Sequence, residues 1–421
     1  MIKNFLFLLK REFKMFLTDT TLLSVFILGP LVYALLFGFV YKEGKVTDLP
    51  VLVVDKDDTP LSNQLVEMLR DNEGIKVLEI SPNNTDLQKE LIKQQAAALV
   101  LIPDRFEADI LQKRYPEIVT YVNTANLLTA NFASKSIQVT LGTMSAGISI
   151  KTLQRKGMSA SMAATQYEPF KANFIRLYNE TGNYLLFMWP ALLAVVLQQV
   201  ILLAMAVSFS REFEKKTFAT QFLTRTRSGF SSIIIKVMPI WIFSVMHLAV
   251  FYGLHFVFQA PIPQHVFNFV IISALFVASA SFLGVFVSVL IPDALKATQV
   301  LMLISSPAFI IGGFTWPLEA MPAIVQGLAA IIPLTPFLQA FKILLIQGGD
   351  LSDTTLFLNH LILLTIIYGL LGYIAVRVKI WIISRREKRA MVPQQVVVVE
   401  KPEVESESES KDQSEKEEDI S

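Results

Sequence analysis

Six long apolar runs, almost free of charge, limit most strongly what this chain can fold into. They stand at 21–41, 184–209, 233–258, 266–291, 297–314 and 356–376. A helix of about 20 apolar residues crosses the hydrocarbon core of a bilayer, and these runs have roughly that length. The chain has 421 residues, of which 53% are hydrophobic and only 17% charged, a balance that few water-soluble proteins show. The sequence therefore predicts an α-helical integral membrane protein with six transmembrane helices.

The segment before the first run has the pattern of a helix that lies on a membrane. In residues 1–20, apolar side chains such as Phe5 and Leu9 recur at helical spacing, and basic side chains such as Lys3 and Lys10 fall between them. We expect an interfacial amphipathic helix there, followed by the first transmembrane helix at 21–41. No small-residue cleavage pattern ends the apolar run, so it is interpreted as an uncleaved signal anchor.

The polar stretch 42–183 is long enough to fold around a core of its own. Short apolar runs typical of strands stand at 49–54, 75–80, 97–102 and 118–122, and helical patterns alternate with them at 61–70, 86–95 and 105–113. A long helix is expected at 127–155. This alternation predicts an α/β domain with a small mixed sheet. Three aspartates after the first strand, at 55, 57 and 58, are interpreted as a turn in preference to a cation site.

Lysine and arginine near the ends of the runs indicate the orientation. They gather before the first run, in the connection after the second, at Lys296 after the fourth and at 377–389 after the sixth, whereas the connection 259–265 has none. With six spans these four groups fall on one side of the membrane. Both termini are therefore expected in the cytoplasm, and 42–183 is expected to be extracytoplasmic.

Two segments of the C-terminal half do not fit a simple span. Within 184–381, which holds five of the predicted transmembrane helices, the stretch 315–351 is apolar but contains four prolines, so we expect short helices that dip into one leaflet. The stretch 382–421 is rich in Glu, Ser and Lys at its end, and we expect a disordered acidic cytoplasmic tail.

The connection 210–231 between the second and third spans carries the most informative motif. It resembles the cytoplasmic loop of type-2 ABC export permeases, whose pattern is close to Arg-Glu-x-Glu-x-Gly-Thr-Leu-Glu-x-Leu-Leu followed by Ser/Thr and Pro. The segments 312–322 and 332–337 resemble the outer segment of the same family, in the branch with a large extracytoplasmic domain. The loop has the residue of the family pattern, or an apolar equivalent of it, at Arg211, Glu212, Glu214, Thr217, Phe218, Phe222 and Thr224. It differs from the pattern at Lys216, Ala219 and Arg225. These departures fit a chain that is paired with a sister subunit.

The resemblance implies that this loop contacts a separate ABC ATPase, with Phe213 completing the coupling residues Arg211, Glu212, Glu214, Thr217, Phe218 and Phe222. From the pattern alone, a solvated connector is as good an interpretation. No GxxxxGK[ST] loop occurs in the chain, so ATP hydrolysis is expected on the partner and not here. The family plan implies two ATPase copies and a second permease chain, identical or a sister subunit. By analogy it also implies a periplasmic adaptor and an outer-membrane channel.

Polar residues inside spans are candidates for the transport path. Because the second and fifth spans line that path in the family, the resemblance points to Gln198, Gln199 and Gln299. Hydrogen bonding between helices is the competing explanation, and we favour it. No catalytic residues, metal site or cofactor are expected, since Cys is absent and no hydrolase motif is present.

The expected function is thus that of a permease for a lipophilic or amphiphilic substrate, drug or lipid-like, in a bacterial inner membrane. Membrane lipid is an expected partner. Nucleic acid is not, because the net charge is only +1. The alternative is a membrane receptor or sensor whose extracytoplasmic domain binds a ligand. The lack of a folded cytoplasmic output domain in the pattern speaks against it.

Overall fold

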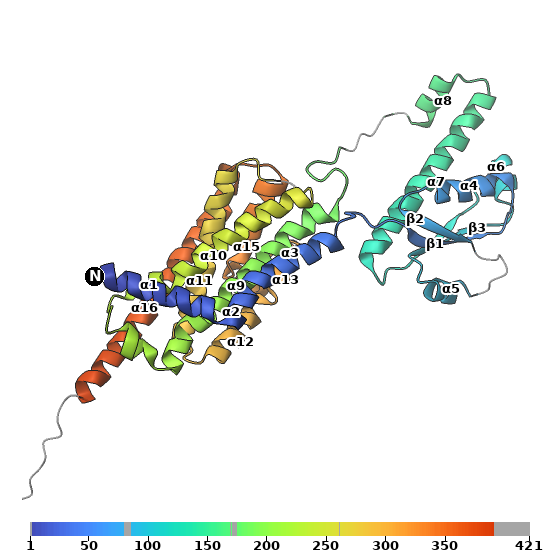
Figure 1. Cartoon of the computed structure of the whole chain (residues 1–421). Coiled ribbons are helices and arrows are strands. Elements are labelled where there is room, and N and C mark those ends of the chain that lie inside the picture. The colour runs from blue at the N-terminus through green and yellow to red at the C-terminus, as the bar shows by residue number, and fades with distance from the viewer. Residues whose placement is uncertain (1, 80–85, 169, 171–174, 261, 391–421) are drawn as a thin grey trace, which may run out of the picture.

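The computed structural model describes residues 2–79, 86–168, 170, 175–260 and 262–390. Figure 1 shows a helical bundle with a separate α/β domain beyond one end, while the N-terminus and the end of the last helix lie at the other. Six helices in the described part are long and apolar enough to cross a membrane, which confirms the predicted number. They span Thr20–Val40, Tyr184–Glu214, Gly229–Val257, Val266–Leu290, Ala294–Ile311 and Leu351–Arg385.

The N-terminal helix α1 (Ile2–Thr18) packs along the bundle instead of extending the first span. Asp19 separates the two, because its carboxylate accepts a hydrogen bond from the Leu22 amide at 3.0 Å and so caps α2 (Thr20–Leu23). The span continues through a π-helical turn, η1 (Ser24–Leu28), into α3 (Gly29–Val40). The ring of Phe16 stacks on Phe243 with centroids 4.8 Å apart, which anchors α1 to the third span.

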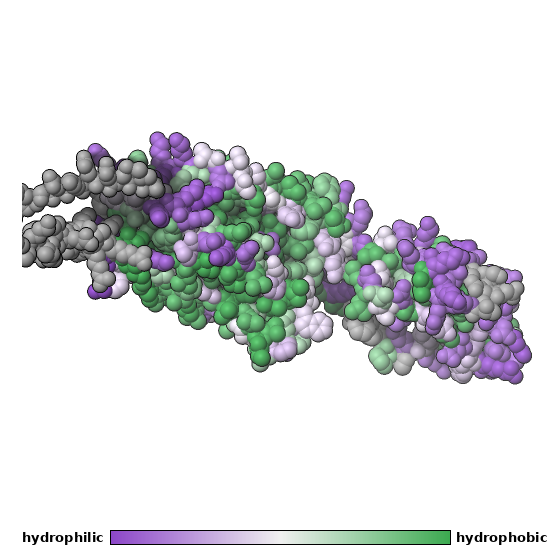
Figure 2. Space-filling model, turned by 90° about the horizontal axis from the view of Figure 1, so that it is seen from below, coloured by the Kyte–Doolittle hydropathy of each residue, from purple (hydrophilic) through white to green (hydrophobic). Residues whose placement is uncertain are grey.

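Helix α9 (Tyr184–Glu214) is the centre of the bundle. It packs against α3, against α10 (Gly229–Val257), against α11 (Val266–Leu290) and against α12 (Ala294–Ser305), and two-thirds of its apolar window is buried. Near its start, Trp189 is fully buried and its indole donates to the Ala34 carbonyl at 2.8 Å. Short α13 (Ala308–Ile311) continues the fifth span, and α16 (Thr355–Ala390) forms the sixth. Figure 2 shows the apolar surface that results around the bundle, with hydrophilic residues toward its ends.

The proline-rich stretch folds as predicted into short helices. After 3-10 turn η3 (Leu318–Ala320), α14 (Ala323–Ala330) meets α15 (Leu334–Phe341) and π-helical η4 (Lys342–Ile346) at an 88° bend, before 3-10 turn η5 (Leu351–Thr354). Side chains satisfy the backbone that the bends expose. The Gln339 amide donates to the Gly313 carbonyl at 2.9 Å, a His360 ring nitrogen lies 2.8 Å from the Ala330 carbonyl, and the Tyr368 hydroxyl donates to Ile331.

The α/β domain contains the predicted small mixed sheet. The strands are β1 (Leu49–Asp55), β2 (Ile75–Glu79), β3 (Ala98–Ile102) and β4 (Val119–Val122), in the order β2-β1-β3-β4. Strand β1 is parallel to both neighbours and β4 is antiparallel to β3. Helices α4 (Pro60–Arg70) and α7 (Leu127–Arg155) bury one face of the sheet, and α5 (Leu87–Lys93) covers the other.

The aspartates after β1 form a turn that also caps a helix. The Asp55 carboxylate accepts the amides of Asp57 and Asp58 at 2.9 and 3.2 Å, and Asp57 accepts the amide of Glu107 in α6 (Phe106–Leu111) at 2.9 Å. Burial acts to raise the pKa of Asp57, but hydrogen bonds from the Thr59 hydroxyl and from backbone amides of α6 outweigh it and lower that pKa. These hydrogen bonds account for the close approach of the three aspartates without a bound cation.

Two features differ from the sequence-based expectations. The first part of the predicted disordered stretch 382–421 is helical, because α16 continues to Ala390. Helix-forming basic residues follow Trp381 there, and the Arg385 guanidinium lies 4.1 Å from the Trp381 ring centre. The rest of that predicted tail, 391–421, lies outside the described residues. A helix not foreseen, α8 (Ala160–Tyr167), packs back on α7.

The contact between α9 and α11 depends on a glycine. A Cβ added at Gly284 would stand 2.4 Å from the Met205 Cβ, whereas one at Gly253 would meet nothing within 4 Å. We expect Gly284→Ala to destabilise the bundle by about 1–3 kcal/mol through overpacking. Gly253→Ala is the matched control and should be neutral or stabilise by up to about 1 kcal/mol, because alanine favours the helix. Thermal unfolding of both variants in one detergent measures this, and equal midpoints would contradict the close packing.

Candidate functional site

The predicted coupling residues gather at the end of the bundle that carries α1 and the C-terminal end of α16. Helix α9 runs on through the expected loop to Glu214, and a π-helical turn, η2 (Phe218–Phe222), follows before α10. Arg211, Glu212 and Thr217 lie on the inner side of this connection, whereas Glu214 is exposed. Glu212 is only 1% exposed, which is unusual for a carboxylate and requires partners.

A buried ion cluster supplies these partners from two other helices. The Lys236 ammonium of α10 lies 2.9 Å from a carboxylate oxygen of Glu12 on α1 and 2.9 Å from one of Glu212 on α9. The guanidinium of Arg11 reaches the same Glu212 oxygen at 2.8 Å and Glu12 at 3.2 Å. The Thr217 hydroxyl donates to the other Glu212 oxygen. The cluster holds two acids and two bases, so its formal charge balances.

Balanced charge and hydrogen bonds between the charged groups allow this cluster inside an apolar bundle. Taking each ion from water costs several kcal/mol, and only close opposite charges offset that cost. A second ion pair beside the cluster joins Arg211 to Asp19, the residue between α1 and the first span. The position of α1 is therefore tied to the end of α9 by charge as well as by packing.

Next to the cluster, four phenylalanines form a connected group, in which Phe218 meets Phe209 and Phe213 edge-on and stacks on Phe222. Phe218 lies 5.4 Å from Phe222, 5.0 Å from Phe213 and 5.9 Å from Phe209, measured between ring centres. The Lys236 ammonium lies 5.4 Å from the Phe222 ring centre. Phe218 and Phe222 are 1% and 0% exposed, so they pack inward and present no face to a partner. The outer face of the connection is polar and consists of Glu214, Lys215, Lys216, Thr220, Gln221, Thr224 and Arg225.

The connection is also held by the start of α1. The Asn4 amide donates to the Arg225 carbonyl at 3.3 Å, and the Arg225 guanidinium lies 3.7 Å above the Phe7 ring. The connection is therefore in contact with α1 as well as with α9 and α10, the helices that it joins.

The three glutamines predicted for the transport path occupy different environments. Gln198 is fully buried in α9, and neither atom of its amide has a hydrogen-bond partner among the described residues. Gln199 is half-buried, and Gln299 lies exposed on α12. Within the described residues, no hydrogen bond joins these three side chains.

Sequence reasoning did not identify Arg11, Glu12 and Lys236 as part of this site. One signal was available, since Lys236 is a charge inside an apolar span and such a charge requires a partner. Glu12 is the acidic residue on α1 that meets it.

The fold and the site define a class, namely a multi-pass membrane permease with an α/β domain between its first and second spans. Residues 20–374 match the family model for the ABC-2 family transporter protein, and the chain therefore belongs to the ABC-2 transporter family. It is 20% identical over 374 residues to the "Probable multidrug ABC transporter permease YbhR" of Escherichia coli (strain K12), covering 89% of this chain and 98% of that relative. The protein of the same description from Escherichia coli O157:H7 matches equally. As an ABC-2 permease the chain has no ATPase activity of its own and requires a partner ATPase subunit.

Removing the lysine from the ion cluster would leave two buried carboxylates against a single guanidinium. We expect Lys236→Met to destabilise the protein by about 3–5 kcal/mol, and Lys236→Met with Glu212→Gln to recover part of that loss because charge is again balanced. The measurement is the thermal unfolding midpoint in detergent. Lys296→Met serves as the control, since that lysine is exposed and its ion pair is worth at most about 1 kcal/mol. A double variant no more stable than the single one would argue against the cluster.

Proposed function

We propose that this chain forms the membrane path of an ATP-driven exporter for lipophilic or amphiphilic substrates, drug-like or lipid-like. The observation that carries the proposal is the buried ion cluster, which joins α1, α9 and α10 behind the polar face of the α9–α10 connection. The Escherichia coli relatives are described as probable multidrug permeases, which supports the same substrate class.

In this proposal the ATPase docks on the exposed face of the connection. Glu214, Lys215 and Lys216 offer it charged contacts, while the inward residues Glu212 and Phe218 pass its movement to the helices. Because a close-packed element shifts as a unit, closure of two ATPase subunits would tilt α9 against its neighbours. Arg211, Phe213, Thr217 and Phe222 then keep the connection rigid.

A second permease chain would complete the path. The first and fifth spans are each only 22% buried over their most apolar window, less than α9 or α11. Their free sides carry large apolar residues such as Leu28, Val32 and Leu303. We propose that the second copy, identical or a sister subunit, covers these sides. Of the three candidate glutamines, Gln299 and Gln199 would lie along the path between the two copies, whereas Gln198 is fully buried within its own bundle and would face that path only if α9 moves.

The orientation belongs to the same proposal. Both termini and the α9–α10 connection are placed in the cytoplasm of a bacterial cell, and the α/β domain outside the inner membrane. This placement is supported by the basic residues at one end of the bundle and by the position of the domain beyond the other (Figure 1). A periplasmic adaptor and an outer-membrane channel would then meet the domain.

The docking face can be tested without disturbing the core. Glu214→Lys changes an exposed residue, so the protein should fold normally while capture of the ATPase falls about tenfold, which corresponds to 1.4 kcal/mol. The assay is co-purification of the tagged permease with ABC ATPase in mild detergent. Glu319→Lys, exposed in the broken segment, is the matched control. If the wild-type chain retains its fold but captures no ATPase, the exporter proposal fails, and ligand binding by the outer domain, as in a receptor, becomes the better function.

The orientation has its own test, made simple by the absence of native cysteine. We expect Thr224→Cys in the α9–α10 connection to react with an impermeant maleimide in inside-out vesicles only. Gln154→Cys on α7 should react in right-side-out vesicles only. Both side chains are exposed, so labelling reports sidedness and not burial. The reverse pattern would invert the proposed topology.

A further inference from the structure

The core of the α/β domain opens into a cavity of about 770 Å³ on the side of the domain formed by α6, α7 and α8. That volume is within the range of about 300–1,000 Å³ typical of small-molecule sites. Its floor is apolar and continuous with the domain core, through Phe106, Ile110, Ile118, Leu141, Met144 and Ile148. Water covering this floor would be costly, and no helix or strand of the described chain covers it.

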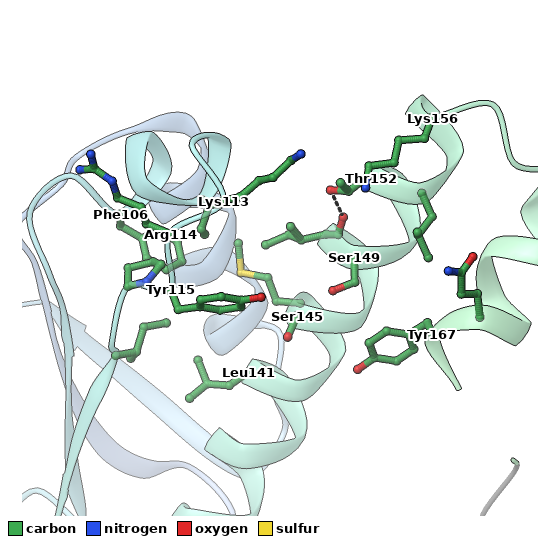
Figure 3. Close-up of a pocket in the computed structure, with 17 residues that line it drawn as sticks. Phe106, Lys113, Arg114, Tyr115, Leu141, Ser145, Ser149, Thr152, Lys156 and Tyr167 are labelled. Carbon is green, nitrogen blue, oxygen red and sulfur yellow. Dashed lines mark hydrogen bonds between the residues drawn. The ribbon is translucent and has the colours of Figure 1, made fainter. Parts of the chain in front are cut away.

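The rim of the cavity is basic. Lys113, Arg114 and Lys156 line it, and no aspartate or glutamate is among its lining residues. Figure 3 shows these cations along one edge of the cavity, with Tyr115 and Leu141 below them and Tyr167 at the side. Arg114 is paired only loosely with Asp109, at 3.5 Å, while neither lysine takes part in an ion pair among the described residues.

The backbone conformation after α6 exposes part of this rim. Lys113 has a left-handed backbone conformation, with φ of 57°, that turns the chain sharply after α6. The turn leaves Tyr115 almost entirely exposed, at 99%, as a ring standing at the mouth of an apolar cavity. Lys156 lies at the end of α7, where its charge also suits the helix dipole, so that residue alone would not indicate a ligand. Lys113 follows the C-cap of α6 and has the same explanation, so what indicates a ligand is the gathering of three cations at the mouth of one apolar cavity.

We propose that this cavity is a binding site for an amphiphile with an anionic head group and an acyl chain. The acyl chain lies on the floor made by α6 and α7, and the head group contacts the ammonium and guanidinium groups of the rim. The hydroxyls of Ser145, Ser149 and Tyr167, which also line the cavity, can donate to the head group. Binding requires neither ATP nor an ATPase, so the site does not depend on the proposed export function.

The test uses the full chain in phosphatidylcholine nanodiscs, because detergent would itself fill such a cavity. The probe is dodecanoate carrying a photoreactive diazirine in its chain, and the labelled peptides are mapped by mass spectrometry. We expect saturable labelling within 106–118 and 141–156, competed by dodecanoate and by dodecyl phosphate but not by dodecyltrimethylammonium. Labelling of the spans by probe dissolved in the bilayer should not saturate. Saturation therefore distinguishes probe bound in the cavity from probe in the bilayer.

Charge reversal provides the decisive comparison. Lys113→Glu with Lys156→Glu should lower labelling of those peptides about tenfold, the size expected for losing two exposed ionic contacts. Lys76→Glu with Lys151→Glu makes the same change of charge at exposed lysines of the same domain outside the cavity, and should label like the wild type. Equal labelling of the two double variants, equal competition by the cationic amphiphile, or labelling confined to the spans would each overturn the proposal.

Discussion

The ammonium group of Lys236 imposes the constraint on which the α1 end of the helical bundle depends. A lone charge within a transmembrane helix would be costly, so the chain must bring carboxylates to it. Glu212 comes from α9 and Glu12 from α1, and Arg11 then balances the second acid. This requirement explains why α1 lies against the bundle, and why the connection after α9 folds inward over its aromatic residues instead of projecting into solvent.

Helix α9 extends this constraint to the other end of the molecule. Its C-terminal end carries Glu212, and its N-terminal end is capped by Asn183, whose side chain accepts the Leu185 amide at 2.9 Å. There the Tyr184 amide donates to the Gly44 carbonyl, so the two chain segments that join the bundle to the α/β domain are fixed to one another. Gly44 has φ of 68°, and a side chain at this position would collide with Asn183. The start of α9 is therefore fixed by a hydrogen bond to the segment that leads into β1.

Structure could be predicted from the sequence wherever a local pattern of residue types determines the element. Long apolar runs located the six spans, short apolar runs located the four strands, and prolines located the broken helices after α13, because each of these signals is local. The ion cluster could not be found in this way. Glu12 and Lys236 are separated by 224 residues, and no rule of spacing joins them. The inward packing of Phe218 and Phe222 could not be predicted either. An apolar stripe on a short helix can pack against a bilayer, a partner protein or the core of the same chain. Helix α8 lacks an apolar period because it buries little beyond Ala163.

Two hollows of the described structure, one in the helical bundle and one in the α/β domain, differ in the charge of their lining and therefore in the molecules they can bind. Between α10, α11 and α16 lies a groove of about 870 Å³ whose lining includes no charged side chain. The hydroxyls of Ser244 and Ser273, which line it, have no hydrogen-bond partner among the described residues. Such a surface can distinguish molecules by shape and lipophilicity, but hardly by charge. The cavity of the α/β domain has a similar volume and adds three cations at its mouth. In this chain the bundle groove is therefore lined by apolar side chains. Discrimination between anionic and cationic amphiphiles requires charged side chains, and these stand at the cavity of the α/β domain, where exposed charges cost little to maintain.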